Sequence, residues 1–133
     1  MHGFNNTFCL NPINFLNLMT VNNIAFFRPG QMTSVQRQSM AMTNMMKAGA
    51  FDLELMHPTT VKLRISSGLL TGDQGINAYW CPYVSGGGLP GFVDFPSHGP
   101  QYPYVFTAAM NGCAFVVTGS PVGCCIRLYH HQH

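Results

Sequence analysis

Residues 51–65 are FDLELMHPTTVKLRI, and the two ends of this stretch share one pattern. Apolar side chains alternate with acids in the first five residues and with bases in the last five. A period of two is typical of a strand with one buried face, so the stretch predicts an antiparallel hairpin with its apolar side chains on the inner face. The hairpin brings opposite charges together on the outer face, Glu54 with Lys62 and Asp52 with Arg64.

The segment before this hairpin has the composition of a helix. Residues 33–47 are rich in Gln, Met and Ala, and Lys47 and Gly49 mark the expected end. We expect its methionines to form a flexible apolar face toward the core, namely Met40, Met42, Met45 and Met46.

A Gly- and Pro-rich segment follows the hairpin. Residues 82–103 contain ten of the twenty-three Gly and Pro residues, which predicts a surface loop without a long helix. The loop is either a plain connection or the rim of a site. It is not a phosphate-binding loop, because no Lys-Ser or Lys-Thr follows the glycines.

A second hairpin is expected near the C-terminus. Residues 114–118 and 124–130 are rich in β-branched and aromatic residues, and residues 120–123, Ser-Pro-Val-Gly, fit a type I turn. A four-residue loop sets the register and places one set of side chains on a common apolar face. The predicted pairs are Val117 with Ile126, Phe115 with Leu128, and Cys113 with His130.

This register places a thiol opposite an imidazole. A histidine can deprotonate a cysteine to the nucleophilic thiolate and return the proton to a leaving amine. Gly112 leaves room for a substrate carbonyl, the backbone N–H of Cys113 can hold an oxyanion, and the Thr107 hydroxyl can orient the ring of His130. A slip of one residue would select His131 instead, so the choice of histidine depends on the register.

The spacing of Thr107, Gly112-Cys113 and His130 resembles the Cys–His glutamine deamidases, grouped around the cytotoxic necrotizing factors, the chemotaxis receptor deamidase CheD and the Burkholderia lethal factor. The resemblance covers under a fifth of the chain, and Asn111 stands where that family usually has Ser. It implies one α+β domain over residues 1–133, a β-sandwich of mixed or antiparallel strands flanked by one or two helices. It also implies hydrolysis of a protein glutamine through a thioester, with Cys113 as nucleophile, His130 as base and Thr107 as the orienting residue.

Other interpretations of the same residues stay open. A strand-end cysteine is often simply buried, and the domain would then be a non-catalytic β-sandwich module that binds a partner through its Gly/Pro loops. Structural zinc is a further alternative, although no Cys-x-x-Cys pair is present. Its ligands would come from Cys124, Cys125, His130, His131 and His133. A substrate rim would use Trp80, Asp94 and His98.

Composition narrows the function classes. Only 10 of the 133 residues are Lys, Arg, Asp or Glu, and the net charge is +2, which argues against nucleic-acid binding. No apolar run is long enough for a membrane span, no basic leader opens the chain, and five cysteines fit a reducing compartment. Together with these exclusions, the resemblance implies a monomeric bacterial effector, secreted or injected into the host cytosol, with a host protein as substrate and without cofactor or metal.

Overall fold

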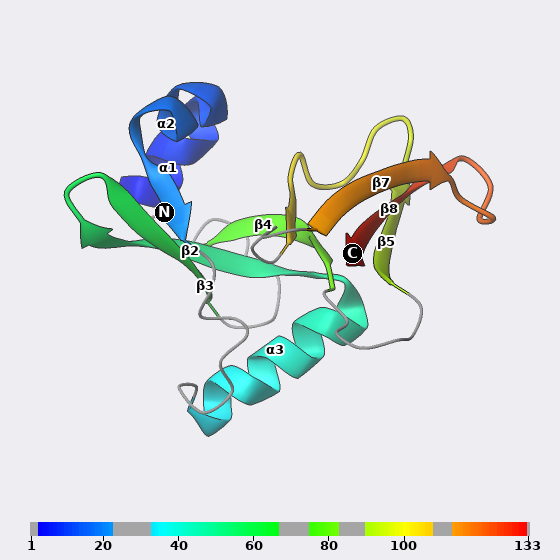
Figure 1. Cartoon of the computed structure of the whole chain (residues 1–133), viewed down its shortest axis with the longest axis horizontal. Coiled ribbons are helices and arrows are strands. Elements are labelled where there is room, and N and C mark those ends of the chain that lie inside the picture. The colour runs from blue at the N-terminus through cyan, green and yellow to red at the C-terminus, as the bar shows by residue number, and fades with distance from the viewer. Residues whose placement is uncertain (1–2, 23–32, 67–74, 83–89, 108–112, 133) are drawn as a thin grey trace.

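The fold is taken from a computed structural model, which describes residues 3–22, 33–66, 75–82, 90–107 and 113–132, without the side chains of Gln36, Cys113 and Gln132 (Figure 1). The described helices are α1 (Gly3–Leu10), α2 (Pro12–Leu18) and α3 (Ser34–Met46). The described strands are β1 (Thr20–Asn22), β2 (Ala48–His57), β3 (Thr60–Ile65), β4 (Ile76–Cys81), β5 (Gly91–Pro96), β6 (Val105–Thr107), β7 (Cys113–Gly119) and β8 (Cys125–Gln132).

The strands form two sheets. The larger sheet has the order β1-β3-β2-β4-β6, and the smaller one has the order β5-β8-β7. The pairs β1–β3 and β4–β6 are parallel, whereas every other described pair is antiparallel. One of the two sheets curls into a half-barrel. The α+β class and the mixed and antiparallel strands expected from sequence are confirmed, with three described helices in place of one or two.

The first predicted hairpin is present as β2 and β3, in the expected register. Strand pairing places Glu54 opposite Lys62 and Asp52 opposite Arg64. The Lys62 ammonium lies 3.6 Å from Glu54, and the Arg64 guanidinium lies 3.0 Å from Glu54 and 3.9 Å from Asp52. The inner face is buried as expected over most of its length, at Phe51, Leu53, Val61 and Leu63.

Aromatic rings fill the core beneath this hairpin. The ring centroid of Phe51 lies 5.6 Å from that of Trp80 and 5.2 Å from that of Phe106. Helices α1 and α2 add Phe8 and Phe15, whose centroids are 5.7 Å apart in an edge-to-face arrangement. Such offset and perpendicular ring pairs are the favoured aromatic geometries, so the core gains specific contacts as well as apolar burial.

Helix α3 covers the predicted range but buries less of its methionine face than expected. Met40 packs against the core, whereas Met42, Met45 and Met46 are exposed, Met45 by 77%. The helix ends at Met46, and Lys47 after it adopts a positive φ of 55° and donates its backbone N–H to the Thr43 carbonyl at 2.8 Å. The predicted end glycine, Gly49, instead lies within β2.

Asn5 joins α1 to β2 through its amide. Its Oδ1 accepts from the Leu53 backbone N–H at 2.8 Å, and its Nδ2 donates to Asp52 Oδ1 at 2.9 Å. The Asn5 side chain is fully buried. β4 pairs with β2 only over Ala48–Phe51. Leu53 lies beyond this paired segment, and the Asn5 amide supplies the acceptor for its backbone N–H.

We expect Asn5→Ala to lower the free energy of unfolding by about 2 kcal/mol, because it leaves the buried Leu53 N–H without its acceptor. Asn6→Ala, at the exposed neighbouring position, is the matched control and should change stability by less than about 0.5 kcal/mol. Urea denaturation measures both values. Equal stability of the two variants would show that the amide bridge contributes nothing.

The second predicted hairpin is present as β7 and β8, but its register differs from the prediction by two residues. Phe115 lies opposite His130, Val117 opposite Leu128, and Gly119 opposite Ile126. The turn lies one residue later than predicted, because Ser120 donates its N–H to the Cys125 carbonyl at 3.2 Å and so encloses residues 121–124, where Cys124 takes a left-handed φ of 63°. A shift of two residues keeps each side chain on its predicted face of the sheet, because side chains alternate between the faces with a period of two. The predicted faces are therefore correct, whereas the predicted residue pairs are wrong.

The Gly/Pro-rich segment is not entirely loop. Its residues 91–96 form β5, which pairs with β8 along its full length. Gly91 permits the close approach of this strand to β4, because a Cβ at this position would lie 1.8 Å from the Pro82 carbonyl oxygen. The absence of a side chain at Gly91 therefore sets how tightly the two sheets meet.

Gly91→Ala should destabilise the fold by about 3 kcal/mol, because the added methyl would overlap a backbone oxygen that cannot rotate away. Gly123→Ala provides the control, since open space surrounds a Cβ there and its stability should change by less than about 1 kcal/mol. Thermal and urea unfolding of both variants test the difference. A Gly91→Ala protein as stable as wild type would contradict the close approach.

Candidate functional site

The predicted cysteine–histidine pair is not formed by the strand register. Cys113 begins β7 opposite Gln132, two positions away from the predicted partner His130. The side chain of Cys113 and all of Gly112 lie outside the described part of the chain. The displaced turn is the physical reason for the change, since a turn that lies one residue later along the chain shifts the pairing of β7 with β8 by two residues.

The predicted contact between Thr107 and His130 is present, and it is buried. Thr107 Oγ1 lies 2.8 Å from His130 Nδ1 and also donates to the Cys81 carbonyl at 2.8 Å. Because the hydroxyl hydrogen goes to that carbonyl, the Thr107 oxygen accepts from Nδ1–H of the ring. Thr107 belongs to β6 and His130 to β8, so this polar contact joins the two sheets.

The neighbouring ionisable groups are held neutral. Burial lowers the pKa of His130, and burial raises the pKa of the Cys81 thiol to about 11. The Cys81 sulfur contacts the Leu128 carbonyl at 3.5 Å and the Gly91 carbonyl at 3.9 Å. A buried thiol with a raised pKa is a poor nucleophile, so this cluster serves to connect β4, β5, β6 and β8.

The His130 contact predicts a pH dependence of stability. The folded pKa lies below the ordinary value of about 6.5, so the unfolded chain binds the proton first as the pH falls. Stability from the neutral ring is therefore complete above about pH 6.5 and is lost as the pH falls toward the lowered folded pKa. His130→Asn should reduce this slope of unfolding free energy against pH.

His57→Asn, at an exposed hairpin position, is the control and should keep the wild-type slope. Chemical denaturation at a series of pH values on both sides of neutrality measures all three proteins. If His130→Asn kept the wild-type slope of unfolding free energy against pH, the result would contradict a buried, neutral His130 ring.

The expected rim residues do not gather at one mouth. Trp80 is 1% exposed and donates its indole N–H to Asn44 Oδ1 at 2.8 Å, so it belongs to the core and cannot line a surface rim. His98 is exposed beyond β5. Asp94 lines a pocket of about 350 Å³ whose other lining residues include Lys47, Tyr79 and Tyr102.

Asp94 belongs to a charged and aromatic cluster that the sequence did not reveal. Its carboxylate accepts two 2.8 Å hydrogen bonds from Arg127, which lower the pKa of Asp94 and raise that of Arg127. The Arg127 guanidinium carbon lies 3.9 Å from the Phe92 ring centroid, and Lys47 Nζ lies 3.3 Å from the same centroid. Desolvation lowers the pKa of Lys47. The pairing of β5 with β8 brings Phe92, Asp94 and Arg127 together, and β5 was expected to be loop.

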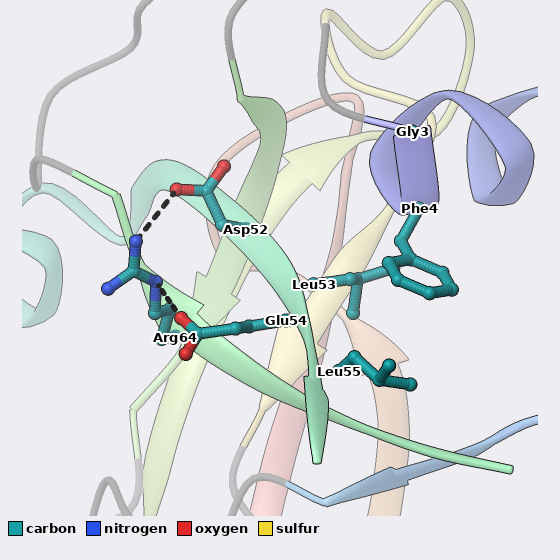
Figure 2. A pocket seen from close by; sticks show the side chains of 7 residues that line it. All are labelled: Gly3, Phe4, Asp52, Leu53, Glu54, Leu55 and Arg64. Atoms are coloured by element: carbon teal, nitrogen blue, oxygen red, sulfur yellow. Dashed lines mark ion pairs between the residues drawn. The ribbon is translucent and has the colours of Figure 1, made fainter. Parts of the chain in front are cut away.

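Beside α1, a pocket of about 290 Å³ borders β2 (Figure 2). Figure 2 shows Phe4, Leu53 and Leu55 gathered on one side of the strand. Asp52, Glu54 and Arg64 lie on the other side and are joined by ion pairs. Because the charged groups already satisfy one another, the pocket offers a partner mainly the apolar surface of Phe4 and Leu55.

The smaller sheet exposes an edge at β7. The Ser120–Cys125 hydrogen bond fixes which residues of β7 bond to β8, since bonded and non-bonded pairs alternate along an antiparallel ladder. The even-numbered residues 114, 116 and 118 bond to β8. The backbone groups of the odd-numbered residues therefore point to the other edge, where no strand pairs with β7 among those that the structure describes.

The side chains of this edge strand are apolar and exposed. Phe115 is 46% exposed, Val116 39% and Val117 61%, and the strand carries no charged residue from Cys113 to Gly119. Figure 1 shows the turn after β7 projecting away from the larger sheet. An uncharged, exposed edge strand is a template for pairing with another chain, and we call residues 113–119 the β7 edge.

Among the residues that the structure describes, no group of three or more His, Cys, Asp or Glu side chains could hold a metal ion. His133, one of the candidate zinc ligands, lies outside these ranges. No helix in the described part of the chain is long and apolar enough to cross a membrane.

Comparison with known proteins identifies a family. Residues 5–132 match the family model described as the Mcf1 activator-binding domain. No curated protein matches the chain. The family match overturns the predicted glutamine deamidase and its enzyme activity, since it spans nearly the whole chain whereas that resemblance rested on the spacing of a few residues.

Proposed function

This chain belongs to the Mcf1 activator-binding domain family, and we propose that it is a non-catalytic domain that binds an activator protein. The family's description supports the interaction module, the second of the two functions considered from sequence. The buried, neutral Thr107–His130 contact is consistent with a structural role for these residues.

The observation that carries the placement of the activator is the β7 edge. Three consecutive apolar side chains are exposed there, beside backbone N–H and C=O groups that point outward. Strand addition to such an edge gives affinity through main-chain hydrogen bonds and specificity through alternate side chains. We therefore propose that an extended, uncharged segment of the activator docks along β7.

The outer face of the same sheet adds a charge preference. Lys47 and Arg127 lie over Phe92, and Asp94 balances only one of these two cations. The cluster thus carries a net charge of about +1 next to an apolar strand, a combination of arginine, aromatic and apolar groups that is common in protein interfaces. An activator with an acidic group beside its docking strand would complement this face.

The pocket beside α1 is the less favoured position for the activator. Its charged residues are paired within the chain, and Leu53 beneath it is buried. Leu55 provides the exposed apolar surface at this position and serves as a control for the proposed interface.

The expected setting in a bacterial toxin that acts on a host fits the named family, and we keep it as part of the proposal. The partner is then an activator protein in place of a protein substrate that presents a glutamine. Delivery by secretion or injection into the host cytosol stays a prediction from sequence.

The proposal predicts that Val117→Lys weakens activator binding at least tenfold, because the ammonium would have to be desolvated beneath the added strand. Leu55→Lys is the matched control, with the same replacement at an exposed apolar residue of the larger sheet, and should bind as wild type. The immobilised chain first retains host proteins, and the retained protein is then purified and titrated by calorimetry against all three forms. If Leu55→Lys alone lost binding, the interface would lie at α1 and β2 instead. If no protein bound the wild-type chain saturably, the proposed binding function would be refuted.

A further inference from the structure

We propose that, without the activator, the β7 edge pairs with the β7 edge of a second copy of this chain. The two strands would run antiparallel about a two-fold axis at Val116 and would join the two smaller sheets into one six-stranded sheet. The pairing itself does not depend on the proposed function. Only its consequence, that self-association competes with the activator, rests on it.

The backbone pattern of β7 selects this register. The outward groups belong to residues 113, 115, 117 and 119, because the even-numbered residues bond to β8. A two-fold axis at residue 116 pairs 113 with 119 and 115 with 117, and each of these pairs can exchange two hydrogen bonds. All the outward groups of the seven-residue strand are then satisfied. An axis at residue 115 or 117 would leave two positions of the strand without a partner.

The side chains are complementary in the same register. Phe115 faces Val117 of the second copy on the inner face of the sheet, and both are exposed in the single chain. Val116 faces its own twin on the outer face. Aromatic with β-branched and paired β-branched side chains are favourable cross-strand neighbours.

Charge also favours a second copy as the occupant. In a two-fold pair any charge near the axis meets a like charge, and the β7 edge carries none. Arg127, the charged residue opposite Thr118 on β8, is already bonded to Asp94 through two hydrogen bonds. Edge strands that avoid self-pairing commonly carry lysine or proline, and residues 113–119 contain neither.

Sedimentation equilibrium of the full chain tests the pairing. Wild type should move from the mass of one chain to that of two as its concentration rises. Val116→Lys should stay monomeric, because two ammonium groups would meet at the axis. Val122→Lys, with the same replacement at the exposed turn, is the control and should dimerise as wild type. Circular dichroism checks that both variants fold.

Cysteine cross-linking tests the register independently. In the proposed pair the two Val116 Cα atoms are a non-hydrogen-bonded pair about 4.5 Å apart, within disulfide range. Val116→Cys should therefore form a 116–116 disulfide, identified by peptide mapping. Thr118→Cys should not link to itself, since its twin lies four residues along the strand, about 13 Å away. A mixture of Thr118→Cys with Ala114→Cys should give the 114–118 link.

A wild-type chain that stays monomeric up to its solubility limit would overturn the proposal, as would a dimer that Val116→Lys does not disrupt. If β7 amides gain hydrogen-exchange protection only when the purified activator is added, the edge serves the activator alone and the self-pairing is refuted. A concentration-dependent dimer with the 116–116 link would support the pairing even if Val117→Lys still bound the activator normally.

Discussion

The architecture depends on one buried polar contact between the two sheets. Thr107 of β6 holds the ring of His130 on β8 and at the same time donates to the Cys81 carbonyl of β4. The hydroxyl donates to one neighbour and accepts from the Nδ1–H of the other, and burial favours the neutral form of the ring. Gly91 on β5, opposite His130, approaches the backbone of Pro82 at the end of β4 more closely than a residue with a Cβ could. A catalytic histidine would need access to substrate, and this ring is fully buried.

Local patterns in the sequence were sufficient for the elements whose partners are close along the chain. The alternation in residues 51–65 predicted both the β2–β3 hairpin and its register, because opposite charges and a short turn specify the same pairing. The α3 helix followed from composition. The second hairpin was predicted without its correct register, since the turn encloses residues 121–124, with Cys124 in a left-handed conformation, and so lies one residue later than Pro121 and Gly123 indicate.

Contacts between distant segments could not be predicted in the same way. β5 lies in a segment with glycine and proline at high density, and its stability as a strand comes from pairing with β8, whose paired residues lie 29 to 39 positions later. The cluster of Lys47, Phe92, Asp94 and Arg127 depends on that pairing. The Thr107–His130 contact was predicted correctly, but as part of a catalytic site. The same hydrogen bond serves equally well to join two sheets, so spacing alone could not distinguish the two roles.

The low charge of the chain explains why β7 has no charged residue to protect its edge. Of the four acidic residues, Asp52 and Glu54 pair with bases on the β2–β3 hairpin and Asp94 pairs with Arg127, so few charges are left to protect sheet edges. A domain that works alone would usually protect β7 with a lysine or a proline. Retaining Phe115, Val116 and Val117 there exposes apolar surface at a cost in solubility. That cost is consistent with a β7 strand that functions when it is paired with another chain. A domain of the activator-binding family needs an exposed surface of this kind for its partner.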